Sequence, residues 1–348
     1  MQIGQNHMKN LVKYYLTKQN RMKNLYGIGF LLLILSTVTG IMIGSSCISL
    51  NDIIKAFTYG ADYSAATKIF TYIRLPRTIA SILCGSALAV SGVIIQAVLA
   101  NQLASPGIIG VNSGAGFLVT LCTALGIYSG WQISVGAFIG AFSAVMIINV
   151  ASRKLGASRS TVILLGVALN SLLGAISDAV ITFVPDVGVM SNNFKVGEFS
   201  AVTYQSLIPV SIIILITIVI VLTMTNELDI LTLGEDNAKA LGMNTSFSRT
   251  LFLVLAALLA GCAVSIAGLL SFVGLVVPHM VRRIAGSKSI HLTGLSVLFG
   301  GSFVCFCDTL ARTVFSPYEI PVGIIMAFLG VPFFVFILIK GKGGHRND

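Results

Sequence analysis

Charged side chains are scarce in this sequence. Asp, Glu, Lys and Arg make up 10% of its 348 residues, whereas soluble domains carry about 25%. Hydrophobic residues make up 55% of the chain. They gather in runs of about 20 residues, the length that a helix needs to cross the hydrocarbon core of a bilayer. The composition therefore excludes a pair of soluble domains and predicts an all-α, multi-pass protein of a cell membrane.

Motifs of covalent chemistry are also missing. The chain has no HExxH and no GxSxG, which excludes the common membrane-protease signatures and leaves no recognisable nucleophile–base pair for an intramembrane hydrolase. It has no Gly-x4-Gly-Lys-Ser/Thr motif, so any ATP that drives this protein must be hydrolysed by a separate chain. We therefore expect a transport protein with no catalytic residue and no cofactor.

Cysteine and basic residues give two further exclusions. All six cysteines except Cys47 fall inside apolar runs, and none belongs to a CxxC pair. We therefore expect small packing residues, with no disulfide and no metal site.

The net charge of +10 comes from short basic clusters between the apolar runs. Such clusters indicate the orientation of membrane helices better than they indicate nucleic-acid binding.

Positive charge also decides the number of spans. The apolar runs centre on nine segments: 25–46, 78–98, 107–127, 131–151, 161–184, 207–224, 250–286, 292–311 and 321–339. The run at 250–286 is long enough for two helices, with turns available at Gly268 and Gly274. If the N-terminus is inside, ten spans place 16 of the 22 Lys and Arg on the cytoplasmic side, whereas nine spans divide them evenly. The positive-inside rule therefore favours ten.

The resulting prediction is one compact bundle of ten transmembrane helices with both termini in the cytoplasm. It divides the chain into a basic cytoplasmic segment at 1–24, a transmembrane domain at 25–340 and a cytoplasmic tail at 341–348. Within the transmembrane domain, a cytoplasmic loop is expected at about 226–248.

Only two acidic residues, Asp178 and Asp308, fall within the predicted spans. Charge inside a bilayer is costly and is a candidate for function. One hypothesis is therefore an ion-coupled secondary transporter that uses Asp178 or Asp308 and needs no ATPase. The simpler alternative places both acids at the outer mouth, beside water or an arginine. Asp308 and Arg312 are four residues apart on one predicted helix, which favours an ion pair between them.

Two polar segments are candidate binding surfaces. The loop at about 226–248 holds four acids and one lysine. Ala238 and Leu241 share one helical face within it, which suits a short helix offered to a partner as well as a solvated connector. Arg74 and Arg77 stand just outside the second predicted span. They suit either an anchor at the membrane interface or the docking of an acidic partner.

Several ordered motifs add a resemblance to this interpretation. They are Arg74-Leu75-Pro76-Arg77-Thr78, residues 85–92, Gln96, residues 101–111, residues 268–279, Asp308-Thr309-Leu310-Ala311-Arg312, and Glu319-Ile320-Pro321-Val322-Gly323. Together they resemble the FecCD-type permeases, the membrane subunits of ABC importers for iron–siderophores, haem and vitamin B12. The resemblance runs from about residue 25 to the C-terminus.

The resemblance implies a subunit of ten helices that pairs with a second permease copy, as a homodimer or a paralogous heterodimer, around a central pathway. It further implies two separate ATPase subunits inside and an extracellular or periplasmic binding protein that delivers the substrate. Transport would proceed by alternating access. A ferric siderophore is the expected substrate because that class is the largest, and haem and cobalamin are the alternatives.

Three sets of residues take their roles from this resemblance. The ATPase-coupling segment corresponds to Gly234, Glu235, Asp236, Ala238, Leu241 and Gly242. The residues that meet acidic groups of the binding protein correspond to Arg74, Arg77 and Arg312. The cytoplasmic gate corresponds to Asn101 and Leu103, with the turn at Ser158 and Ser160. The family usually has proline where this chain has Gln102, which makes the turn at the gate less rigid.

Overall fold

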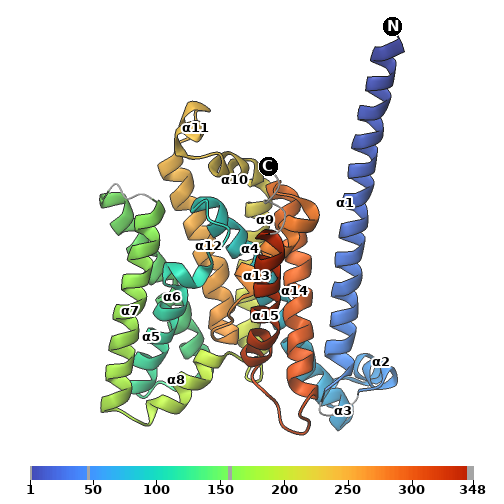
Figure 1. The fold of residues 1–348 in the computed structure, drawn as a ribbon. Helices are drawn as coiled ribbons and strands as arrows, with labels where there is room; N and C mark the ends of the chain where they lie inside the picture. The colour runs from blue at the N-terminus through green and yellow to red at the C-terminus, as the bar shows by residue number, and fades with distance from the viewer. Residues whose placement is uncertain (1, 45–47, 156–158, 343–348) are drawn as a thin grey trace.

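The computed structural model describes residues 2–44, 48–155 and 159–342, with side chains described for 19–44, 48–155 and 160–336. Cys47 and Ser158 lie outside these ranges. Every regular element in the described chain is helical, and ten helices form one bundle (Figure 1). They are α1 (Gln2–Met42), α4 (Leu75–Val98), α5 (Val111–Ala124), α6 (Gly130–Lys154), α7 (Arg159–Phe183), α9 (Tyr204–Thr223), α12 (Thr245–Ala267), α13 (Val273–Ala285), α14 (Ser289–Thr313) and α15 (Val322–Lys342).

The predicted all-α bundle is confirmed, and its ten long helices match the ten predicted spans in number. Seven of them contain stretches long and apolar enough to cross a membrane, and α5 and α15 contain shorter apolar stretches. The tenth, α13, comes from the long apolar run at 250–286, which the structure divides into α12 and α13. The chain turns between them at Gly268, whose φ of +68° favours glycine. As an even number of crossings requires, α1 begins and α15 ends at the same end of the bundle (Figure 1).

Short helices mark the two ends of the bundle. At one end, α10 (Thr225–Thr232) and α11 (Glu235–Ala240) connect α9 to α12, and we call this the α11 end (Figure 1). At the opposite end lie α2 (Leu50–Tyr59), α3 (Ala65–Lys68) and α8 (Val187–Val196), and we call this the α8 end. Two irregular helical segments flank α4: η2 (Ile69–Arg74) precedes it and η3 (Pro106–Ile109) lies between it and α5.

Helix α4 is the centre of the bundle. Nearly all of its residues are buried, and it packs against α12, α13 and α14. The packing depends on glycine, because a Cβ at Gly85 would lie 2.2 Å from the Gly300 carbonyl oxygen of α14. A Cβ at Gly92 would lie 1.9 Å from the Gly274 carbonyl oxygen of α13. Small residues let membrane helices approach this closely, and dispersion contacts then hold them together.

The orientation of the bundle is open to a direct test. We expect the α11 end to face the cytoplasm because the positive-inside rule places most basic residues there. Lys288 precedes α14 at the α11 end, and Tyr318 lies in the connection from α14 to α15 at the α8 end, with 79% of its surface exposed. In intact cells, an impermeant maleimide should label a Tyr318→Cys variant and leave a Lys288→Cys variant unlabelled. Labelling of position 288 from outside would overturn this topology, and the unsubstituted chain controls for its native cysteines.

Candidate functional site

The segment expected to couple to an ATPase forms a compact turn at the α11 end. Gly234 and Gly242 bracket α11 with φ values of +104° and +83°, which only glycine adopts readily. Between them, the Glu235 carboxylate pairs with Lys239 at 3.0 Å and with Arg249 of α12 at 3.0 Å. The hydrogen bond from Lys239 and the charge of Arg249 lower the pKa of Glu235. These contacts tie α11 to the start of α12.

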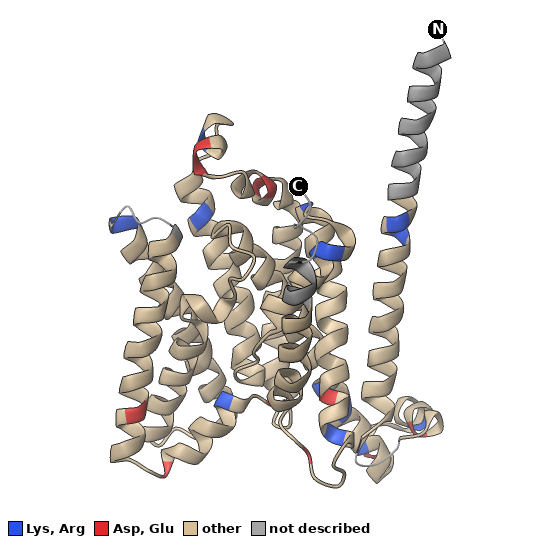
Figure 2. Ribbon diagram, in the orientation of Figure 1, with Lys and Arg blue, Asp and Glu red and all other residues tan. Residues whose placement is uncertain are grey.

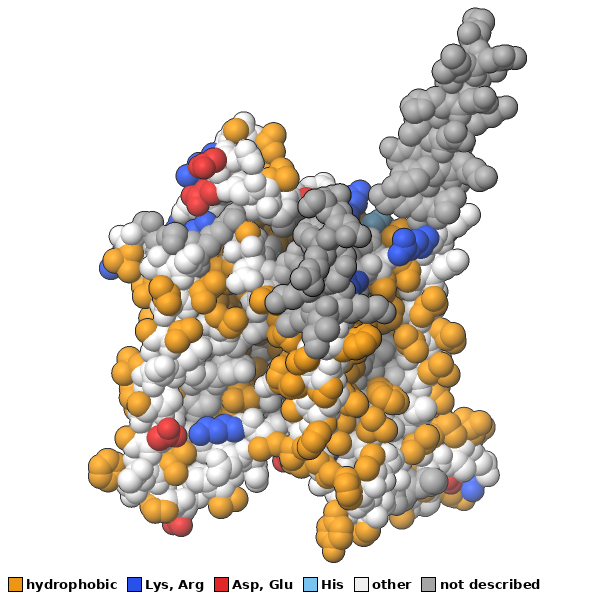
Figure 3. Space-filling view, in the orientation of Figure 1, with side chains coloured by type: hydrophobic (Ala, Val, Ile, Leu, Met, Phe, Trp, Pro, Cys, Tyr) orange, Lys and Arg blue, Asp and Glu red, His pale blue; other side chains and the backbone are white. Residues whose placement is uncertain are grey.

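The structure corrects one expectation about this turn. Ala238 is fully buried, whereas Leu241 is 64% exposed, so the two residues do not present a common face to a partner. The helix spans only six residues, and it packs on α10 and α12. The apolar side chains that remain exposed here are Leu233, Leu241 and Phe247, which we call the coupling patch. Figure 3 shows hydrophobic side chains on this protruding part of the surface.

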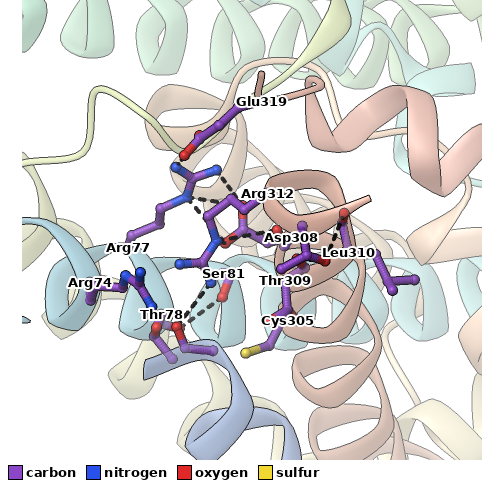
Figure 4. Close-up of polar contacts among 12 residues, drawn as sticks. Arg74, Arg77, Thr78, Ser81, Cys305, Asp308, Thr309, Leu310, Arg312 and Glu319 are labelled. Carbon is purple, nitrogen blue, oxygen red and sulfur yellow. Dashed lines mark hydrogen bonds and ion pairs between the residues drawn. The ribbon is translucent and has the colours of Figure 1, made fainter. Parts of the chain in front are cut away.

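A network of charged side chains occupies the α8 end of the bundle (Figure 4). Arg77 of α4 donates through Nε and Nη2 to the carboxylate of Asp308 on α14, at 3.0–3.2 Å. Its Nη1 donates to Glu319 Oε2 at 2.7 Å. The Arg77 and Asp308 side chains are 7% and 1% exposed. Removing two charges from water is costly, so the fork geometry and the second carboxylate are needed to offset the desolvation.

Two more arginines extend this network to α1. Arg312 pairs with Asp308 at 3.3 Å, which confirms the predicted i,i+4 pair, and its Nη2 donates to the Gly40 carbonyl oxygen at 3.0 Å. Arg74 Nη1 donates to the Ile41 carbonyl oxygen at 3.1 Å. The network therefore joins α1, α4 and α14 to the connection that carries Glu319.

The burial of these arginines changes the interpretation of the predicted docking surface. Arg74, Arg77 and Arg312 are 4%, 6% and 3% exposed, and their guanidinium groups bind partners within the chain. Sequence reasoning placed them on an exposed rim because they follow or precede apolar runs, and spacing alone does not reveal that they point inward. It did not assign Glu319 to the cluster, although Glu319 belongs to one of the quoted motifs. Their role in docking stays a prediction.

The residues expected to form the gate lie in the connection from α4 to η3. Asn101 Oδ1 accepts the Leu103 backbone N–H at 2.9 Å, a local turn that leaves Leu103 49% exposed. Close by, Arg282 of α13 donates to Gln96 Oε1 of α4 at 2.9 Å, a contact that sequence reasoning did not assign. Gln102 lines a cavity with Gln96 and Arg282.

The same connection touches α7 on its other side. Asn170 Nδ2 donates to the Gly107 carbonyl oxygen at 3.1 Å, and a Cβ at Gly166 would lie 2.1 Å from the Ile108 carbonyl oxygen. Ser160, the other described gate residue, lies in the first turn of α7 and is exposed. The predicted gate residues therefore belong to two elements that pack against each other through η3.

Known proteins resemble this chain along most of its length. The model of the FecCD transport family matches residues 32–340. The chain belongs to the FecCD transport family. Similar proteins are the Fe(3+)-citrate import system permease of Bacillus subtilis (32% identity, 90% of this chain and 94% of the relative), the hemin transport system permease of Yersinia pestis (34%, 79% and 84%) and the vitamin B12 import system permease of Yersinia pseudotuberculosis (35%, 81% and 85%).

A solved structure agrees with this assignment. A chain described as an inward-facing conformation of an ABC transporter of the metal-chelate type superposes with a TM-score of 0.82 at 28% identity, covering 91% of this chain and 99% of the other. The protein is therefore the multi-pass permease subunit of an ABC importer for iron chelates, haem or vitamin B12, and it is not itself an ATPase. It works with ATPase and binding-protein partners. Membership of an ABC importer excludes the hypothesis of an ion-coupled secondary transporter.

The two intramembrane acids predicted from the sequence now differ in their expected effect on stability. An Asp308→Asn change removes the partner of two buried arginines, and breaking a buried pair costs about 3–5 kcal/mol. Asp178 is 75% exposed and lies 3.8 Å from Lys195, so Asp178→Asn should cost about 1 kcal/mol or less. The midpoint of thermal unfolding in detergent should fall strongly for Asp308→Asn and little for its matched control. Equal midpoints for the two variants would contradict the network.

Proposed function

We propose that this chain imports a ferric siderophore, as one of two permease copies that enclose the pathway. The family includes transporters of several ligands at similar identity to this chain, so the ligand is not decided by identity alone. A ferric complex is supported by the likeness to an iron-citrate permease and to a transporter of the metal-chelate type. In this proposal the binding protein selects the ligand and the permease provides the path.

The exposed face of α7 supports a pairing with a second copy. Ser171, Asp178 and Thr182 are exposed and lie at i, i+7 and i+11, so they form one polar stripe along α7. Helix α7 also exposes apolar side chains such as Leu172, but every exposed residue of α9 between Ile208 and Ile220 is apolar. A polar stripe is costly against lipid tails, whereas α9 suits them. We therefore assign α7 to the central pathway or to the partner copy, and α9 to the bilayer.

The coupling patch is our candidate for the ATPase contact. Leu233, Leu241 and Phe247 are each more than half exposed at the α11 end, which we orient toward the cytoplasm. Large apolar groups exposed on a polar rim mark protein contacts. Since Glu235 ties α11 to α12 through Arg249, a push on α11 reaches the transmembrane helices directly. The contact between α7 and η3 then suits a gate that opens when these helices rock against each other.

At the α8 end, we propose an indirect role for the buried arginines in docking the binding protein. The connection from α14 to α15 carries exposed Phe315 and Tyr318, and Arg77 holds this connection through Glu319. The arginines would thus position a surface loop rather than contact acidic residues themselves.

The coupling patch predicts the outcome of a single substitution. Leu241→Asp places a charge in an apolar contact and should reduce the amount of ATPase that co-purifies with the permease at least tenfold, because burying an unpaired charge is costly. Leu241→Met should retain assembly. Tyr128→Asp is a matched control, since Tyr128 is 61% exposed at the α8 end. Undiminished co-purification of ATPase with the Leu241→Asp variant would refute this contact.

The substrate is tested with the reconstituted importer. We expect the ATPase activity of the permease–ATPase complex in liposomes to rise when its binding protein is loaded with a ferric siderophore. Haem and cobalamin, offered to the same binding protein at equal concentration, should leave the activity at its basal level. Stronger stimulation by either of these ligands would overturn the siderophore assignment and leave the importer assignment intact.

A further inference from the structure

A basic cavity lies at the α11 end beside α1, next to the smaller cavity that Gln96, Gln102 and Arg282 line, and the two cavities share Ser287. Its volume is about 570 Å³, and it lies between α1 and the connection from α13 to α14. Arg21 contributes to it from α1, and Arg283, Lys288 and His291 contribute from α13, α14 and their connection. Among the residues whose side chains the structure describes, no acidic residue lines it. Figure 2 shows basic positions on α1 and on the bundle facing one another at this level.

The cavity is held open by contacts at its edges. Arg21 Nη2 donates to the Ile284 carbonyl oxygen in the last turn of α13, at 3.0 Å. The Tyr26 hydroxyl lies 3.5 Å from His291 Nδ1, and the two rings meet edge to face at a centroid distance of 6.1 Å. The nearby acid Asp229 of α10 accepts the Ser289 backbone N–H at 2.8 Å, outside the cavity lining. The described lining of the cavity therefore includes Arg21, Arg283 and Lys288 and no carboxylate.

The position of the cavity selects the ligand. Arg21 lies about one turn before the apolar part of α1, where Ile28, Leu31 and Leu32 are exposed within about three turns of Arg21. Tyr26 lies between them, as is common for aromatic residues at the headgroup level of a bilayer. A ligand at this place meets cations at one end and lipid-facing aliphatic side chains at the other.

We propose that this cavity binds the phosphate of an anionic phospholipid, whose acyl chains lie along α1. Basic pockets between transmembrane helices on the cytoplasmic side suit such headgroups. The start of α14 adds the partial positive charge of a helix N-terminus beside Lys288. The lipid would bridge α1, which is peripheral, to α13 and α14. This binding goes beyond the transport function and does not depend on the identity of the substrate.

Native mass spectrometry of the full-length permease, delipidated and titrated with single lipids, tests the proposal. We expect phosphatidylglycerol to bind at least tenfold more tightly than phosphatidylcholine. An Arg283→Gln, Lys288→Gln double variant should lose roughly thirty-fold in affinity for phosphatidylglycerol, because each removed cation weakens attraction to an anionic lipid. Both side chains are exposed, so the variant should fold. An Arg153→Gln, Lys154→Gln variant is the matched control, since it removes two cations from the same end outside the cavity.

Several results would overturn the proposal. One is equal affinity of the double variant and the control for phosphatidylglycerol. Another is complete competition by inorganic phosphate or glycerol 3-phosphate at the concentration of the lipid, which would assign the cavity to a soluble phosphate. A third is loss of ATPase co-purification by the double variant with lipid affinity unchanged, which would assign the cavity to the protein partner. Recovery of lipid affinity in a Lys288→Arg variant, compared with Lys288→Gln, would support the role of charge.

Discussion

The ion pair between Arg77 and Asp308 fixes the helix around which the others are arranged. Both side chains are almost completely buried, so each is stable only while the other is in place. The pair locks α4 to α14 at the α8 end, and close glycine contacts join α4 to α14 and α13 in the middle of the bundle. At the α11 end, the bond from Arg282 to Gln96 ties α4 to α13 once more. The centre of the subunit therefore resists sliding along its length.

Such a core leaves motion to the elements around it. Helix α11 is held through Glu235, which pairs with the exposed Lys239 and with the largely buried Arg249 of α12. Helix α7 has a largely exposed outer face and meets η3 through a close backbone contact at Gly166. Force from an ATPase on α11 would reach α12, which packs on α4 and α6. A stiff core would transmit this force because its helices would not rearrange against one another. A rigid centre with an adjustable periphery would suit the alternating access that we expect of this subunit.

The periphery also has two chemically different ends. At the α8 end, the positive charge of three arginines is directed inward and held by Asp308, Glu319 and backbone carbonyl oxygens. At the α11 end, the described lining of the cavity beside α1 has three cations and no acidic residue. Basic side chains therefore hold the helices together at the α8 end. At the α11 end, in our proposal, they attract the phosphate of a membrane lipid.

The sequence by itself determined the ten helices and the family. Apolar length and charge asymmetry are local properties of the chain, and the pair between Asp308 and Arg312 follows from helical spacing alone. Only the tertiary structure decided that Arg77 reaches Asp308 across 231 residues, that Ala238 points inward, and that Arg21 meets the last turn of α13. The physical reason is that hydropathy shows how deep a side chain lies in the membrane. Which face of a helix meets a neighbour depends on packing between segments far apart in the chain.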